Sequence, residues 1–183
     1  MKFLSLDPSL TNTGWASGLI DDGQVIVREI GLIESPKGKS KQVRASSDTI
    51  ARCRNTWQQV QELIDLFDPN VIFAETPTGS QSANGMKSYG ATCQLLACLP
   101  VIPTEVTAEQ VKVAATGKKT ASKADVIDWA FSLYMELDWL FHAGKLQAKN
   151  EHMADAIAAA YAGVKTSQFR QLASMFAGAK EYS

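Results

Sequence analysis

The N-terminal part of the chain alternates short apolar runs with turn residues. Apolar and β-branched positions over 3–6, 14–20 and 24–33 predict three short strands. The sequence Asp21-Asp22-Gly23 between the last two runs is typical of a tight hairpin turn. The three strands should therefore form an antiparallel meander. Residues 36–47 are polar and basic without an apolar period, so a loop is expected there.

After this loop the apolar period lengthens to three or four residues, which predicts amphipathic helices. The next expected elements are, in order, a helix at 48–67, a buried strand at 71–75, a helix at 84–98 and a short strand at 101–104. The Asp68-Pro69 pair ends the first of these helices, because proline disfavours helical geometry in the residue before it. Helices thus alternate with strands in this part of the chain, as in an α/β fold.

Two capping boxes mark the starts of the following helices. Thr107 has Gln110 three residues later, and Ser122 has Asp125 at the same spacing. The first helix should end near Gly117, and the second should extend through residue 133 toward 135–138.

The last strong pattern is an alanine-rich helix at 150–163 that ends on glycine. Residues 164–183 are weakly amphipathic, and their structure is not predicted. A chain of 183 residues with 45% hydrophobic residues has the size of one domain, so residues 1–183 are taken as a single domain with a C-terminal tail at 164–183.

Composition excludes some classes of protein. No window reaches the roughly 18 apolar residues of a membrane span, and the N-terminus lacks a signal pattern, so a cytoplasmic protein is expected. Three cysteines without paired spacing predict free thiols at Cys53, Cys93 and Cys98. The net charge of −1 neither indicates nor excludes nucleic acid, because phosphate contacts depend on local clusters of Lys and Arg.

Two predicted strands end on a carboxylate. Asp7 closes the first strand before a turn-rich segment, and Glu75 closes the strand at 71–75 before Thr76-Pro77. A buried carboxylate is costly without a partner, so each is a candidate metal ligand. Asp7 has an alternative role as a turn cap with Ser9 or Thr11. If the two strands are parallel neighbours, their carboxylates lie at the same edge of the sheet.

The alanine-rich helix adds two further candidate ligands. His152 and Asp155 are three residues apart and therefore share one helical face. Two carboxylates about 4 Å apart repel by roughly 4 kcal/mol at an effective dielectric near 20, so a gathering of three needs a cation or proton uptake. An oxygen-rich set favours Mg²⁺ or Mn²⁺ over zinc. Taken alone, the pair is more typical of an acidic first helical turn than of a metal site.

Four segments of the chain resemble, in the same order, the RuvC-type Holliday junction resolvases of the ribonuclease H-like superfamily. They are the first strand and turn at 4–14, the second strand at 71–75, a basic segment at 110–123 and a helix segment at 152–158. The resemblance covers roughly residues 1–163. Each motif is weak by itself, but four in register are specific.

The resemblance implies a ribonuclease H-like α/β fold with a central mixed five-stranded sheet flanked by helices. It implies a homodimeric crossover junction endodeoxyribonuclease that cuts four-way DNA junctions symmetrically and leaves 5′-phosphate and 3′-hydroxyl ends. Two Mg²⁺ ions per active site, replaceable by Mn²⁺, would be held by Asp7, Glu75, His152 and Asp155. His152 would be either a ligand or the general base, because a neutral imidazole can orient water.

The resemblance also implies DNA contacts from lysines. Lys112 and Lys123 match family positions near the scissile phosphate, and Lys118 and Lys119 add charge that the family pattern does not require. Such contacts position the backbone without reading bases. Without the resemblance, these lysines would indicate a solvated face. The basic loop at 36–47 could contact a junction arm or serve only as an exposed linker.

One departure from the family concerns junction opening. Family members commonly place an aromatic residue shortly after the second catalytic Glu, but Glu75 is followed by Thr-Pro-Thr-Gly-Ser at 76–80. Broader action on forks and flaps is therefore an alternative. Tyr89 could supply part of the stacking, although a core or dimer contact is the more usual role of an aromatic on a helix. The helix at 84–98 is the candidate dimer surface.

Other functional classes were weighed against a nuclease. Actin-like and sugar-kinase ATPases also begin with an Asp-containing strand and a turn that binds phosphate, but they need two such domains, which 183 residues do not supply. A non-catalytic junction-binding protein is the remaining alternative. The sequence carries no readable motif for a branch-migration motor or for a cleavage preference.

Overall fold

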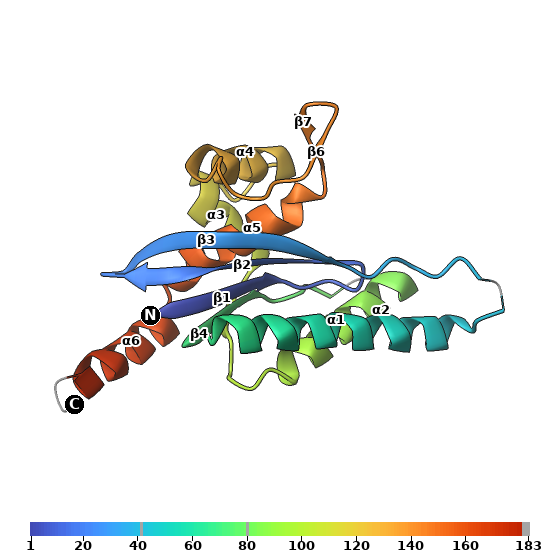
Figure 1. The fold of residues 1–183 in the computed structure, drawn as a ribbon, viewed down its shortest axis with the longest axis horizontal. Helices are drawn as coiled ribbons and strands as arrows, with labels where there is room; N and C mark the ends of the chain where they lie inside the picture. The colour runs from blue at the N-terminus through green and yellow to red at the C-terminus, as the bar shows by residue number, and fades with distance from the viewer. Residues whose placement is uncertain (41, 80, 181–183) are drawn as a thin grey trace.

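The computed structural model describes residues 1–183 except 41, 80 and 181–183, and describes no side chains for 177–180. A mixed five-stranded sheet in the order β3-β2-β1-β4-β5 forms its centre. The strands are β1 (Lys2–Asp7), β2 (Asn12–Asp21), β3 (Gln24–Glu34), β4 (Val71–Glu75) and β5 (Thr104–Val106). The helices are α1 (Ala45–Phe67), α2 (Ala83–Ala97), α3 (Ala108–Thr116), α4 (Lys123–Leu133), α5 (Asn150–Gly163) and α6 (Ser167–Lys180). The predicted mixed sheet flanked by helices is confirmed (Figure 1).

The predicted meander forms one half of the sheet, since β1, β2 and β3 pair antiparallel. Its hairpin turns at Asp22 and Gly23, which both have positive φ, as a two-residue turn of this hand requires. The other half is parallel, because β4 pairs with β1 and β5 with β4. The carboxyl ends of β1 and β4 therefore lie side by side.

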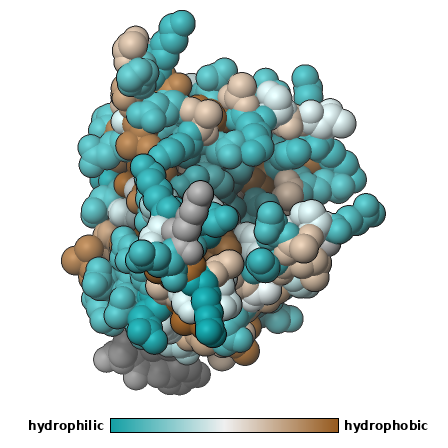
Figure 2. Space-filling model, turned by 90° about the vertical axis from the view of Figure 1, so that its right-hand side faces the viewer, coloured by the Kyte–Doolittle hydropathy of each residue, from teal (hydrophilic) through white to brown (hydrophobic). Residues whose placement is uncertain are grey.

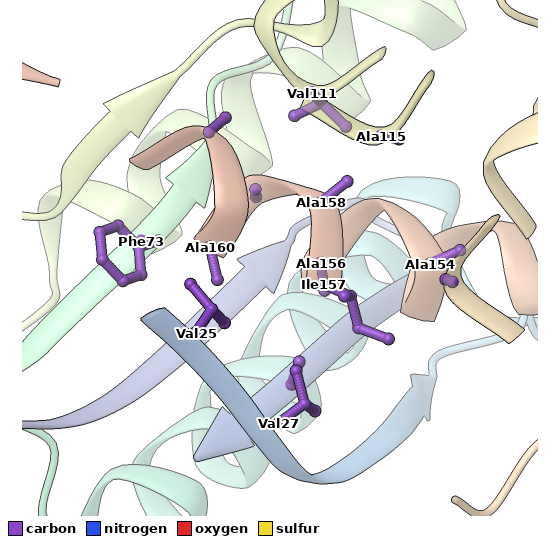
Figure 3. Packing of buried hydrophobic residues seen from close by; sticks show 14 of the residues in the cluster. Val25, Val27, Phe73, Val111, Ala115, Ala154, Ala156, Ile157, Ala158 and Ala160 are labelled. Atoms are coloured by element: carbon purple, nitrogen blue, oxygen red, sulfur yellow. The ribbon is translucent and has the colours of Figure 1, made fainter. Parts of the chain in front are cut away.

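One face of the sheet is covered by α5, with α3 and α4 packed outside it (Figure 1). Alternate strand residues, including Phe3 and Phe73, point into this layer, and ten of the 14 residues of α5 are buried. Figure 3 shows the small alanine side chains of α5 between the strands and α3. Because alanine adds little bulk, the helix backbone lies close to the sheet. Phe169 of α6 packs on Phe73, with ring centroids 5.6 Å apart.

The opposite face carries α1 and α2. Leu4, Leu6 and Ile72 point to this side and pack against Val60 of α1 and Leu95 of α2. Only two of the 23 residues of α1, Thr56 and Val60, are buried. The hydrophobic effect therefore holds α1 through its C-terminal half, while its N-terminal half is exposed.

Several of the sequence predictions are wrong in their bounds. The first helix begins at Ala45, so the predicted loop at 36–47 is three residues too long. The residues 45–47 at its start are all exposed and so carry no apolar period. The short strand predicted at 101–104 also differs, because β5 lies at Thr104–Val106. Ile102 is 87% exposed, and Pro103 lacks the N–H that a ladder needs.

The capping boxes at Thr107 and Ser122 both form, and Gly117 ends α3 in the left-handed conformation, as predicted. The second of these helices stops at Leu133 rather than continuing to 135–138. The helix at 150–163 has its predicted bounds, and the one at 84–98 begins and ends one residue earlier.

Some structure was not predicted, notably α6 in the tail and a small hairpin of β6 (Phe141–His142) and β7 (Lys145–Leu146). The three cysteines are free thiols, as expected. Among the residues that the structure describes, no helix is long and apolar enough to cross a membrane.

Candidate active site

Asp7 lies at the carboxyl end of β1, opposite Gly14 of β2. The turn between these strands is closed by other residues, since the Ser9 hydroxyl donates to the Asn12 carbonyl and the Thr13 hydroxyl donates to the Ser9 carbonyl. The Asp7 carboxylate instead lies 2.7 Å from Nδ1 of His152. The alternative of a turn cap is therefore not what the structure shows.

Gly14 explains how α5 reaches Asp7. A Cβ at position 14 would lie 2.0 Å from the carbonyl oxygen of His152, so only glycine lets the two backbones approach this closely. The first turn of α5 is held further by an ion pair between Lys149 and Glu34 of β3, at 2.8 Å. Together these contacts place the start of α5 over the end of β1.

Glu75 lies at the end of β4, beside the end of β1, because Leu6 pairs with Ala74 in the parallel ladder. Burial and the charges of Asp7 and Asp155 raise its pKa from 4.5 to about 8, although Lys112 acts in the opposite direction. Asp7 and Glu75 therefore lie at the same edge of the sheet, as the sequence predicted for parallel neighbouring strands. At neutral pH a group with this pKa is mostly protonated.

Asp155 lies one turn along α5 from His152. Burial, followed by the negative charge of Asp7, raises its pKa from 3.8 to about 7, while His152 and Lys123 partly offset the effect. His152 and Asp155, which the sequence predicted as a pair, thus both lie close to Asp7, as Glu75 does. Cations in the protein compensate only part of the negative charge gathered here.

His152 is held by Asp7. Burial lowers the pKa of its imidazole, but the hydrogen bond to Asp7 and the negative charges of Asp7, Glu151 and Asp155 outweigh burial, so the pKa is raised. When the ring is neutral and Nδ1 donates to Asp7, the lone pair lies on Nε2. That nitrogen is 3.6 Å from a carboxylate oxygen of Glu151.

The donor set suits a hard divalent cation. Three carboxylates and one imidazole offer mainly oxygen, which Mg²⁺ and Mn²⁺ prefer. The carboxyl pKa values of Glu75 and Asp155 are raised first by burial and then by the neighbouring negative charges, both of which a bound cation would offset. Across the described part of the chain, no three His, Cys, Asp or Glu side chains converge closely enough to hold a metal as they stand. Metal binding would thus require these side chains to draw together and lose protons.

The four predicted lysines separate into two pairs. Lys112 and Lys123 act on the pKa values of Glu75 and Asp155, so they flank the carboxylates. Lys119 instead forms an ion pair with Glu109 and lines a cavity with Ala162 and Lys165, at the other end of α5. Lys118 is exposed near Asp125.

Sequence reasoning missed Glu151. Its carboxylate forms an ion pair with Lys123 at 2.8 Å and helps to raise the pKa of Asp155. The available signal was its position four residues before Asp155, which puts both carboxylates on one helical face. Glu151 therefore holds Lys123 at the rim of the site.

Comparison with models of protein families finds none that matches the chain. Curated relatives are similar over most of its length. The crossover junction endodeoxyribonuclease RuvC of Prochlorococcus marinus (strain AS9601) is 25% identical over 163 residues, which cover 87% of this chain and 94% of that protein. The RuvC of Orientia tsutsugamushi (strain Boryong) is 25% identical over 175 residues, covering 93% and 99%.

Solved structures of T. thermophilus RuvC share the fold. The one in complex with Holliday junction substrate matches with a TM-score of 0.61 and 20% identity, covering 88% of this chain and 92% of that chain. A second Thermus thermophilus RuvC structure matches with a TM-score of 0.57. Similarity along most of the sequence and the shared architecture agree with the resemblance drawn from four motifs: the chain is similar to RuvC proteins over most of its length and has their ribonuclease H-like fold.

Proposed function

We propose that this protein is a structure-selective DNA endonuclease that resolves four-way junctions. The single observation that carries the proposal is the meeting of Asp7, Glu75, His152 and Asp155 at one edge of a RuvC-type sheet. It would hydrolyse phosphodiester bonds by symmetric nicks that leave 5′-phosphate and 3′-hydroxyl ends. Its action would belong to DNA recombination and repair in the cytoplasm.

Two Mg²⁺ ions, replaceable by Mn²⁺, are proposed for the site. Asp7, Glu75, Asp155 and His152 would hold them. When bound, such a pair activates a water as nucleophile and stabilises the leaving oxygen of an in-line displacement. The chain itself supplies the carboxylates, which would lose their protons on metal binding, and holds them at the partly buried ends of β1 and β4.

His152 has two candidate roles, ligand and general base, and both use Nε2 while Nδ1 is bound to Asp7. The variants His152→Asp and His152→Gln separate them. A ligand role predicts that Asp, which offers an anionic oxygen to a metal, keeps much more nicking activity than Gln, whose amide oxygen is neutral. A general-base role predicts that both variants lose the dependence of the rate on a group with the raised pKa of His152.

Lys112 and Lys123 are proposed to contact phosphates beside the scissile bond, since both lie by the carboxylates. Phosphate contacts of this kind position the backbone and weaken with salt. Lys118 and Lys119 are proposed to contribute less, because they lie away from the acidic cluster and Lys119 is paired with Glu109.

A wider range of branched substrates, including forks and flaps, is the second candidate. It is favoured by the absence of an aromatic residue in the segment 76–79 that follows Glu75. Tyr89 of α2 is the candidate substitute, because it lines a cavity of about 450 Å³ together with Thr76 and Pro77. Stacking of Tyr89 on an unpaired base would be worth about 1–3 kcal/mol.

A homodimer is proposed because symmetric nicks need two active sites. The candidate surface is α2, which exposes Met86 beside the half-buried Tyr89. Sedimentation of the purified chain tests this directly. A monomer that nicks only one strand of a junction would contradict the dimer.

The deciding experiment incubates wild type and Asp7→Asn with an immobile four-way junction, a fork and a flap in Mg²⁺. Symmetric nicking of the junction by wild type alone supports a resolvase, and equal cutting of all three substrates supports the broader nuclease. Binding without cutting by wild type would leave a non-catalytic junction-binding protein. ATP turnover without nicking would reject a nuclease altogether.

A further inference from the structure

The segment 36–54, here called the basic arm, concentrates positive charge. It holds six of the 18 basic residues of the chain and one of its 19 acidic residues, in a protein whose net charge is −1. The six are Lys37, Lys39, Lys41, Arg44, Arg52 and Arg54, of which Lys41 lies outside the described residues. The proposed active site does not use any of them.

The root of the arm is fixed to the turn that follows Asp7. Arg52 donates from Nε to the carbonyl of Ser35 at 2.6 Å, and from Nη2 to Leu10 and Thr11 of that turn. The Ser35 N–H in turn donates to the Thr11 carbonyl. The arm is therefore anchored at the same edge of the sheet as the carboxylates.

From this root the arm projects beyond the sheet. Ser35, directly after β3, is level with Thr56 of α1, since their buried hydroxyls are 2.9 Å apart. The helix residues 45–55 precede that point, and at 1.5 Å per residue they extend about 16 Å past the sheet edge. Figure 1 shows the loop and the start of α1 reaching out from the end of β3, and Figure 2 shows a largely hydrophilic surface at this end. A hydrogen bond from the Gly38 N–H to Asp48 ties the loop to the helix.

Three cations of the arm are available to bind a partner. Lys37, Lys39 and Arg44 are exposed and form no ion pair with any described residue, whereas Lys119 and Lys123 are paired with Glu109 and Glu151. Binding phosphate at the arm would thus break no existing pair. The single carboxylate there, Asp48, accepts the Gly38 N–H.

We propose that the basic arm binds the phosphate backbone of a duplex arm of the branched DNA whose branch point lies at the carboxylates. This inference rests on the proposed function and adds a second contact surface to it. A reach of about 16 Å corresponds to roughly five base pairs at 3.4 Å per pair. The contacts follow backbone charge and are independent of base sequence.

The test uses Lys37→Gln/Lys39→Gln/Arg44→Gln in an Asp7→Asn background, which prevents cutting. Loss of three phosphate contacts should lower the slope of log affinity against log salt by about 2.7 and weaken junction binding roughly tenfold or more at physiological salt. A matched control, Lys2→Gln/Arg28→Gln/Lys165→Gln, removes the same charge from exposed positions away from the arm. An equal loss in the control, or no loss in the arm variant, overturns the inference.

Duplex length provides a second readout. Junctions whose arms are shortened to about three base pairs and closed by hairpin loops, which keep them paired, should bind the wild-type protein and the arm variant with equal affinity, because the basic arm then has too little duplex to contact. A difference that persists on such short arms would contradict the assigned surface. Nicking by the wild-type protein distinguishes failure of this inference from failure of the proposed function. If the wild type cuts junctions while the arm variant binds them normally, only the inference about the basic arm fails. If the wild type neither binds nor cuts branched DNA, the proposed function fails as well.

Discussion

The two faces of the sheet are packed in different ways. On one face, α5 buries ten of its 14 residues and lies close enough to β2 that Gly14 has no room for a Cβ. On the other face, α1 buries two of 23 residues, and a cavity of about 320 Å³ remains between α1, α2 and the segment Pro8–Leu10. The same strands serve both faces, since alternate side chains point to opposite sides.

This difference divides the proposed work of the protein. Asp7 and Glu75 point to the closely packed face, where α5 brings His152 and Asp155 to them. Chemistry with metals needs positions fixed within fractions of an ångström, which dense packing supplies. The loosely held helix α1 instead extends past the sheet and carries the basic arm. Each of the following predictions tests this division.

The largest effect is expected from Asp155→Asn. It removes a carboxylate from the closely packed face, so nicking of a four-way junction in Mg²⁺ should fall by about three orders of magnitude or more. Cys53→Ala, which alters the cavity on the other face, is the control and should nick at nearly the wild-type rate. Comparable losses in both variants would show that the faces do not differ in this way.

Gly14→Ala should strongly destabilise the protein. Its Cβ would lie 2.0 Å from the His152 carbonyl, a backbone atom that cannot move aside, so we expect a cost of about 3 kcal/mol or more. Thermal unfolding followed by circular dichroism measures this cost. A melting temperature equal to that of wild type would mean that α5 is not held closely against β2.

Glu75→Gln should stabilise the metal-free protein at high pH. The folded-state pKa of about 8 lies above the ordinary value of 4.5, so the folded protein binds more protons than the unfolded chain between these values. Wild-type stability is therefore lost as the pH rises from 4.5 toward 8, by up to about 1.4 kcal/mol per pH unit. Melting in EDTA should show the variant gaining on wild type over this range. A difference that is constant with pH would contradict the raised pKa.

The smallest effect is expected from Gly90→Ala on α2. A Cβ there meets nothing within 4 Å, and replacing a glycine inside an exposed helix with alanine should stabilise the protein by roughly 0.5–1 kcal/mol. Urea unfolding gives the value. Destabilisation instead would show that this side of the molecule is packed more closely than the structure indicates.

Local patterns in the sequence predicted most of the elements, for reasons that need no tertiary contact. The meander, its Asp22-Gly23 turn, the capping boxes and the helix at 150–163 depend on short-range turn chemistry and on apolar period. The start of α1 at Ala45 was not predicted, because an exposed helical turn has no period of apolar residues. The strand at Thr104–Val106 was predicted too early, because the apolar residues Val101 and Ile102 are exposed rather than buried in the sheet.

By itself the sequence determined the candidate ligands, since it put Asp7 and Glu75 at strand ends and His152 and Asp155 on one helical face. Their charge state was decided only by the tertiary structure, because burial and mutual repulsion raise the carboxyl pKa values, and the Asp7–His152 bond joins residues 145 positions apart. The separation of Lys112 and Lys123 from Lys119, and the anchoring of the basic arm by Arg52, likewise depend on long-range contacts. Distances between residues far apart in the chain are set by packing, which local patterns do not encode.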